Sequence, residues 1–154
     1  MLIIVYFINE IGLIMAIWFE GVSIEQMNER GAGTLSDLLQ IEFTELGEDY
    51  IKATMPVTAD HKQPIGLLHG GANVVLAETL ASTAANCVID IKSHFCVGLE
   101  INANHLRAVK EGMVTAITTP IHLGRTTQVW QIEIFDEAGK KTCISRMTAS
   151  VLKR

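Results

Sequence analysis

A stretch of twenty residues from Gly70 to Ile89 constrains the fold more than any other part of the chain, because it is almost entirely apolar and holds one acidic residue, Glu78. We predict a helix here, from about Gly71 to Val88. A helix that is apolar most of the way round is expected to be buried. Because an uncompensated buried charge is very costly, a carboxylate in this helix must be paired, protonated or used in chemistry.

The neighbours of Glu78 along the helix leave two interpretations open. Residues at three- and four-residue spacing lie on the same side of a helix, and here they form a narrow seam of Gly71, Val75, Ser82 and Asn86. One interpretation is a structural carboxylate that Ser82 and the nearby backbone satisfy. The other, which we favour, is a carboxylate with a chemical function.

The length, composition and net charge of the chain indicate one globular domain and argue against several classes of function. The chain has 154 residues, of which 49% are hydrophobic, and this is enough for a real core. A net charge of −5 gives no overall bias toward nucleic acid or membrane lipid, although it allows a local basic site for a phosphorylated ligand. The three cysteines form no C-x-x-C pair, so neither a disulfide framework nor a zinc site is indicated. We expect reduced thiols in a cytoplasmic protein.

The first nineteen residues are apolar, but they do not have the pattern of a targeting segment. Asn9 and Glu10 interrupt them, and no Lys or Arg precedes them. A signal peptide has a positive start and a small-residue cleavage site, and a membrane span needs about twenty uninterrupted apolar residues. We interpret residues 1–14 as an extension from a mis-assigned start codon and residues 15–154 as the domain. A membrane anchor or an extra packed helix is the alternative.

Signals on both sides of the long helix predict an α+β fold. Ser23 and Gln26 match a capping box, so a short helix should begin there and end at Gly31 and Gly33, with another turn or two in 34–39. Alternating patterns predict strands at 41–46, 49–57, 95–106, 113–123, 126–135 and 141–152. Their short connections imply antiparallel hairpins. We expect one long buried helix backed by a single antiparallel sheet of five or six strands.

The glycines Gly70 and Gly71 stand at the start of the predicted long helix. A helix N-terminus offers unpaired N–H groups and a field that favours negative charge, and glycine lets a ligand approach the backbone closely. This arrangement suits the oxyanion that develops when a carbonyl is attacked. A simple tight turn is the equal alternative.

The spacing of Gly70 and Glu78 bears on how both could act. Eight residues of helix separate them by roughly 12 Å, so a carbonyl held at Gly70 is out of reach of Glu78 in the same chain. If both groups act on one substrate, they come from two chains, as a two-fold dimer allows.

Other chemistries lack support. We expect His61 and His94 to be exposed, while His69 could orient the loop or a substrate. No histidine has metal-ligand spacing, so no metal site is predicted. Neither a G-x-S-x-G elbow nor a phosphate-binding glycine loop is present.

The segment 66–72, GLLHGGA, followed by Glu78, resembles the hotdog-fold acyl-CoA thioesterases, in the branch with the phenylacetate-pathway and 4-hydroxybenzoyl-CoA enzymes. The segments 97–105 and 128–135 are similar to bacterial 1,4-dihydroxy-2-naphthoyl-CoA hydrolases of menaquinone synthesis and to their siderophore-pathway proofreading relatives. The resemblance covers about residues 15–152. It implies the predicted fold, usually as a dimer of dimers (a homotetramer), without metal or cofactor.

The resemblance also implies roles for residues by position. Glu78 would be the nucleophile or general base, and the Gly70 N–H would polarise the thioester carbonyl. Gln63 and His69 would lie near that carbonyl, and Ser82 would assist the hydrolytic water. The CoA portion would contact Gly98, His105, Leu106, Arg107, Ala108, His122, Leu123, Gly124, Arg125, Thr126, Thr127 and Arg146.

Three functions are therefore weighed. The first is a thioesterase that hydrolyses an acyl-CoA, aromatic by the resemblance, with no partner other than substrate and further copies of itself. The second is a hotdog dehydratase or hydratase, which the motif matches less well. The third is a non-catalytic acyl-CoA-binding module, although binding alone needs no carboxylate such as Glu78.

Overall fold

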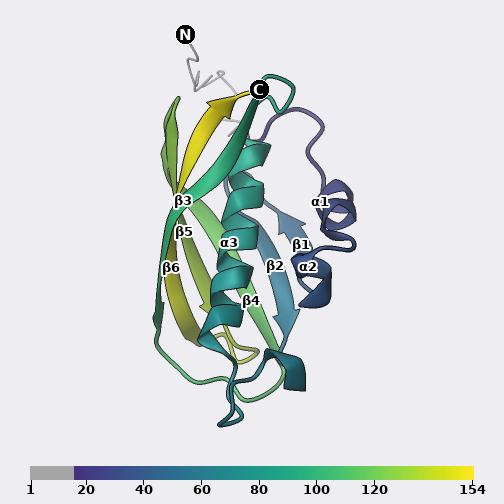
Figure 1. The fold of residues 1–154 in the computed structure, drawn as a ribbon, viewed down its shortest axis with the longest axis vertical. Helices are drawn as coiled ribbons and strands as arrows, with labels where there is room; N and C mark the ends of the chain where they lie inside the picture. Colours follow the sequence, from purple (N-terminus) through teal and green to yellow (C-terminus); the bar gives the residue numbers. More distant parts are fainter. Residues whose placement is uncertain (1–15) are drawn as a thin grey trace, which may run out of the picture.

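The computed structural model describes residues 16–154 and has the predicted α+β architecture (Figure 1). Two short helices come first and one long helix follows the second strand. In chain order the elements are α1 (Ile24–Gly31), α2 (Leu35–Leu38), β1 (Glu42–Leu46), β2 (Ile51–Pro56), the 3₁₀ turn η1 (Ala59–His61), α3 (Gly70–Cys87), β3 (His94–His105), β4 (Met113–Leu123), β5 (Thr127–Phe135) and β6 (Lys141–Lys153). The interpretation of residues 1–14 lies outside the described residues.

The six strands form one sheet in the order β1-β2-β4-β5-β6-β3, and every neighbouring pair is antiparallel. The predicted strands therefore all exist, and no end is displaced by more than two residues. The alternation in β5 is confirmed, since Gln128, Trp130, Ile132 and Ile134 are all buried. One long helix on one antiparallel sheet is the hotdog arrangement that the resemblance implies.

Local signals explain the two short helices. The Ser23 hydroxyl accepts from the N–H of Gln26 at the start of α1, as the capping box predicts. Thr34 caps α2 in the same way through the N–H of Ser36. In addition, the side-chain amide of Asn28 pairs with both backbone groups of Phe43, with bonds of 2.8 and 3.0 Å. These two bonds attach helix α1 to the edge strand β1. They satisfy the two backbone groups of Phe43 that a further strand would otherwise bond.

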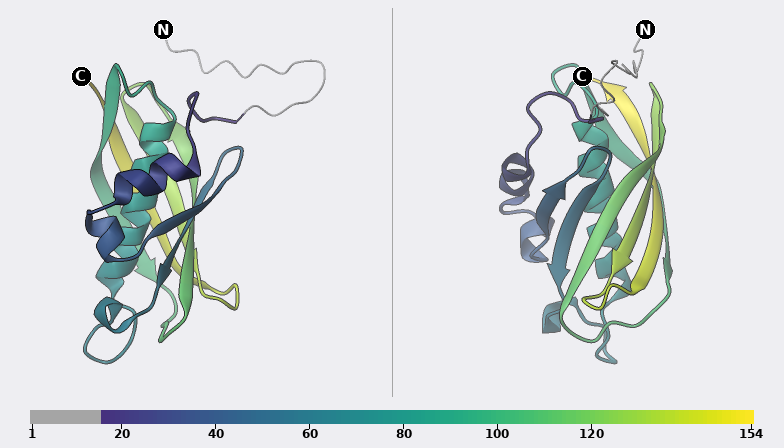
Figure 2. Two further views of the ribbon diagram at one scale, coloured as in Figure 1. Left: turned by 90° about the vertical axis from the view of Figure 1, so that its right-hand side faces the viewer. Right: turned by 180° about the vertical axis from the view of Figure 1, so that it is seen from behind.

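Helix α3 lies along one face of the sheet, which curves around it (Figures 1 and 2). The residues of its inner face are completely buried: Leu76, Ala77, Leu80, Ala81, Ala84 and Ala85. Alanine side chains allow the helix backbone to approach the strands closely, and burial of apolar area is the main force that holds the two layers together. Opposite them, Trp130 is fully buried and stacks on Trp18 with ring centroids 6.3 Å apart.

The prediction that Glu78 is buried is wrong for the single chain, where its side chain is exposed. The reason is that the sheet covers only one side of α3, so the seam of Gly71, Val75, Glu78, Ser82 and Asn86 lies on the uncovered side or at its border. No helix among residues 16–154 is long and apolar enough to cross a membrane.

Candidate active site

The N-terminus of α3 is shaped by the histidine that precedes it. The backbone of His69 is extended, and its Nδ1 accepts from the N–H of Gly71 at 2.8 Å. The His69 carbonyl accepts from the N–H groups of Ala72 and Asn73. Within the described residues, the N–H of Gly70 has no hydrogen-bond partner. The helix therefore keeps one free donor at its positive end.

The loop before α3 is a compact turn that brings Gln63 beside this donor. The N–H of Gln63 donates to Leu67, the N–H of Gly66 donates back to Gln63, and Lys62 bridges to Leu68. Gly66 has a φ of +81°, which favours glycine.

The prediction that His61 is exposed is wrong, because its side chain is 2% exposed. Its Nδ1 contacts the carbonyl of Pro56, and its own carbonyl accepts from the N–H of His69. These two contacts hold the loop in position, so His61 has a structural role. His94 is partly buried, with Ser93 beside its ring.

A pocket of about 270 Å³ lies at this end of the molecule. It is lined by Gln63, Leu67, Leu68, Gly70, Asn73, His105, Leu106, Arg107, Ala108 and Val109. The His105 ring lies over the start of the helix, because its Nε2 is 2.8 Å from where a Cβ on Gly70 would be. The structure thus brings together six of the residues selected from the sequence, namely Gln63, Gly70, His105, Leu106, Arg107 and Ala108.

Glu78 lies two turns further along α3, outside this pocket. Its Oε1 is 2.9 Å from where a Cβ on Gly98 would be, so the missing side chain on β3 makes room for the carboxylate. Within the described part of the chain, no hydrogen bond or salt bridge occupies that carboxylate. The Ser82 hydroxyl points to the sulfur of Met147 at 3.5 Å and does not hold Glu78.

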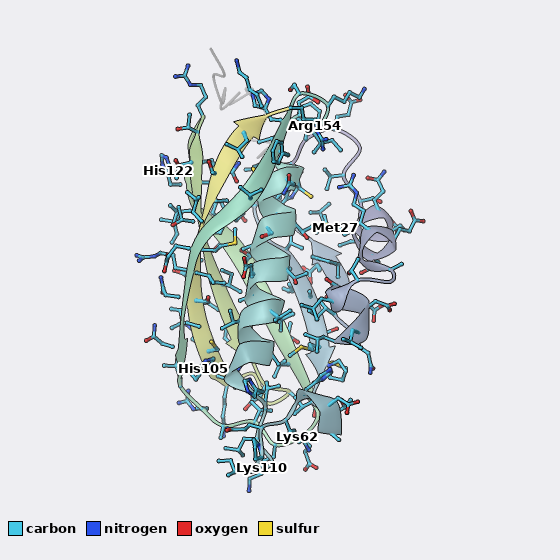
Figure 3. All side chains as sticks on the ribbon, viewed as in Figure 1. Met27, Lys62, His105, Lys110, His122 and Arg154 are labelled. Carbon is cyan, nitrogen blue, oxygen red and sulfur yellow. The ribbon has the colours of Figure 1, made fainter. Side chains whose placement is uncertain are left out.

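The remaining selected residues lie elsewhere in the single chain. Figure 3 shows His105 near one end of the molecule and His122 toward the other. The turn after β4 is tight, since a Cβ on Gly124 would be 2.6 Å from both His122 Nε2 and the carbonyl of Thr127. Leu123, Arg125 and Thr126 belong to the same hairpin. Arg146 is exposed on β6, between buried neighbours that face α3, so it lies on the opposite face of the sheet.

The buried thiols can be set aside as nucleophiles. Burial raises the pKa of Cys87 and of Cys96 to about 11 and also raises the pKa of Cys143. Since the thiolate is the reactive form, all three are unreactive near neutral pH. Among residues 16–154, no group of three His, Cys, Asp or Glu side chains is placed to hold a metal ion.

Sequence reasoning missed two contacts of this site. Asn73 lines the pocket beside His105, and its polar side chain on a buried helix face, three residues after Gly70, was the available signal. The contact between Gly98 and Glu78 depends on how β3 passes α3, which no local pattern reveals.

What a single chain offers is two separate groups. A free backbone donor, with a pocket beside it, can stabilise negative charge on a carbonyl oxygen. An unpaired carboxylate, roughly 12 Å away along the helix, can act as a base or nucleophile.

Comparisons with known proteins identify the family. The model of the family described as the thioesterase superfamily matches residues 65–143. The chain is 48% identical to the 1,4-dihydroxy-2-naphthoyl-CoA hydrolase of Escherichia coli, over 88% of this chain and 99% of that protein. It is 46% identical to the proofreading thioesterase EntH of Cronobacter turicensis, over 88% and 98%. A solved structure of a mutant thioesterase of Pseudomonas aeruginosa matches with a TM-score of 0.89 and 45% identity, over 90% of this chain and 100% of that one.

Proposed function

This chain belongs to the thioesterase superfamily and is a thioester hydrolase, and from that premise we propose that it cleaves aromatic acyl-CoA thioesters to the free acid and CoA. The observation that carries the proposal is the pair of unoccupied groups on α3, the N–H of Gly70 and the carboxylate of Glu78. The first donates to the thioester carbonyl oxygen. The second attacks the carbonyl carbon or deprotonates the water that attacks it.

The aromatic acyl group is supported by the relatives. The Escherichia coli protein is named for 1,4-dihydroxy-2-naphthoyl-CoA, a bicyclic aromatic thioester. We extend that substrate class to this chain, and with it a place in menaquinone synthesis. In this chain the walls of the pocket beside Gly70 include the apolar side chains of Leu67, Leu68 and Val109, together with polar Gln63 and His105. Such a lining suits a flat apolar group with a few polar substituents.

We further propose that each active site is shared between two copies of the chain. One substrate carbonyl cannot touch both Gly70 and Glu78 of one helix across roughly 12 Å. The exposure of Glu78 fits this proposal, because a second copy would cover it. Edge strand β3 supplies a surface for association, with Val97 40% and Leu99 63% exposed.

The test of the function is thiol release from benzoyl-, hydroxybenzoyl-, 1,4-dihydroxy-2-naphthoyl- and straight-chain acyl-CoAs. We expect the wild type to prefer aromatic thioesters and Glu78→Ala to lose about 1000-fold or more in kcat, because the attacking group is removed. Glu29→Gln, a change on exposed α1 far from the site, is the control and should leave kcat unchanged. Unchanged turnover in Glu78→Ala would refute the mechanism.

The shared site has its own test, in which two inactive variants are mixed. Glu78→Ala lacks the carboxylate and Gly70→Pro lacks the N–H, so each homodimer is defective. After unfolding and joint refolding, we expect about one quarter of wild-type activity, because half of the dimers are mixed and each of these holds one intact site. Activity no greater than the sum of the separate variants would contradict a shared site.

A binding module without catalysis is the competing function. It predicts no thiol release from any thioester in the panel, together with tight binding of the CoA ester to both wild type and Glu78→Ala. Calorimetric titration with a non-hydrolysable acyl-CoA thioether separates this outcome from a poorly folded preparation, which binds nothing.

A further inference from the structure

One buried polar atom of the pocket is left without a partner. Asn73 is 5% exposed, and within the described residues its Oδ1 has no hydrogen bond. The other side of the amide has a contact, since Nδ2 lies 3.5 Å from Nδ1 of His105. The free Oδ1 is an acceptor, and Asn73 is one of the residues that line the pocket.

Such an atom needs an explanation. Native proteins pair the large majority of buried polar atoms, and leaving one unpaired costs about 1–3 kcal/mol. Only one other side-chain atom in the described part of the chain is in this position, Oγ1 of Thr58, which does not line the pocket. Asn73 is therefore the one such group that a molecule in the pocket could satisfy.

Its position relates it to the reacting carbonyl. Asn73 follows Gly70 by three residues, so both lie on one side of α3 with roughly 4.5 Å of rise between them. A carbonyl oxygen that accepts from the Gly70 N–H thus has the Asn73 acceptor close by. A hydrogen-bond donor that is part of the same substrate, a few bonds from that carbonyl, comes within reach of Oδ1.

We propose that Asn73 is a specificity-determining residue whose Oδ1 accepts a hydrogen bond from an O–H or N–H donor beside the thioester carbonyl of the substrate. This rests on the proposed function. Two parts of an acyl-CoA carry such a donor: a hydroxyl ortho to the carbonyl on an aromatic acyl group, and the first amide N–H of the pantetheine arm. Because a site built around a donor leaves its own acceptor unpaired with an analogue lacking it, such a site discriminates strongly.

Two pairs of substrates separate these sources. The first pair is 2-hydroxybenzoyl-CoA and benzoyl-CoA, which differ by the hydroxyl. The second is the benzoyl thioester of N-acetylcysteamine and the same thioester with an ester oxygen in place of the amide N–H. We expect the wild type to prefer the donor-bearing member of one pair by about 10-fold or more in kcat/KM.

The variants then assign this preference to Asn73. Asn73→Leu replaces the amide with an apolar group of similar size and should bring the ratio of that pair close to one. Thr58→Val replaces the other unpaired hydroxyl with a methyl group and should leave both substrate ratios unchanged. If Asn73→Leu does not fold, Asn73→Ala serves, since it only shortens the side chain.

The outcomes are distinguishable. Wild-type ratios of both pairs near one, or a preference that persists in the Asn73 variants, would overturn the role of Asn73 and leave the thioesterase proposal standing. No hydrolysis of any thioester by the wild type would overturn the proposed function and this inference with it.

Discussion

Two asparagines on α3 touch β3 at opposite ends, and their surroundings differ. Asn86 is saturated: its Oδ1 accepts from the N–H of Cys96 at 2.9 Å, and its Nδ2 donates to the carbonyls of Ser82 and Cys96. Asn73 makes one long contact and keeps a free acceptor. At one end of the helix an asparagine thus attaches α3 to β3 by two hydrogen bonds, whereas at the other end an asparagine keeps an unpaired acceptor.

The rest of each end follows the same division. Beside Asn86, the buried Gln128 amide donates to the carbonyl of Ala85 and accepts from the indole of Trp130. Beside Asn73 are a pocket, a free N–H at Gly70 and the ring of His105. A closed polar network stabilises and specifies a core, whereas open polar groups on a rigid helix are suited to a ligand. We therefore expect substitutions at the closed end to act on stability and those at the open end on activity.

Among the substitutions that test this contrast between the two ends of α3, the largest effect is expected at Gly70. It is the first residue of α3, where proline is favoured, and the extended His69 is compatible with a following proline. Gly70→Pro removes the N–H, whereas Gly70→Ala keeps it and only displaces the His105 ring. We expect a loss of about 100- to 1000-fold in kcat for proline and a much smaller loss for alanine, in steady-state assays. Equal losses would show that steric contact with His105, not the donor, matters.

Gly31→Ala is the matched control for these two variants, since a Cβ there meets Ser36 at an ordinary 3.5 Å. Its kcat should equal that of the wild type.

The next largest effect is expected when the hydrogen bonds of Asn86 are removed. Asn86→Ala leaves the N–H and carbonyl of Cys96 unpaired, so we expect the free energy of unfolding in urea to fall by about 2–3 kcal/mol. Asn73→Ala should cost less, because its acceptor is already unpaired. Equal destabilisation by the two variants would contradict the proposal that the Asn86 end, and not the Asn73 end, contributes to stability.

A smaller effect is expected from the indole at the closed end. Trp130→Phe leaves Oε1 of Gln128 without its donor, and we expect a loss of about 1–2 kcal/mol in unfolding free energy. Adding Gln128→Leu removes the orphaned amide as well and should restore part of this loss. If the double variant loses more unfolding free energy than the two single variants lose together, a local network is contradicted.

The smallest effect concerns the thiols. The folded-state pKa of Cys87 and of Cys96 lies near 11, above the ordinary value of 9.0. Their contribution to stability is therefore complete below about pH 9 and is lost between about pH 9 and 11. At pH 8, a thiol reagent should label the native protein slowly and the urea-unfolded protein at once. Fast labelling of native protein would contradict the burial.

The fold was predictable from the sequence because its signals are local. The capping box at Ser23, the alternation of β5 and the turn residues between strands all act over a few residues, and the structure has each of them. The separation of Gly70 and Glu78 was predictable too, because helix rise fixes it.

Side-chain environments were less predictable, because they depend on which layers cover an element. Glu78 was expected to be buried, yet α3 has the sheet on one side only. His61 was expected to be exposed, yet the loop folds over it. The open acceptor of Asn73 results from the meeting of α3 with the end of β3, which no pattern in either segment reveals.

The pairing of Asn28 with Phe43 has a consequence for growth of the sheet. Each edge strand has one residue whose N–H and carbonyl are both bonded by an asparagine side chain, Phe43 in β1 and Cys96 in β3. Strand β1 has only five residues, whereas β3 has twelve, so the longer free edge lies on β3 beyond Cys96. In the proposed dimer the two sheets would join through this part of β3, and the short edge at β1 would disfavour the addition of further strands.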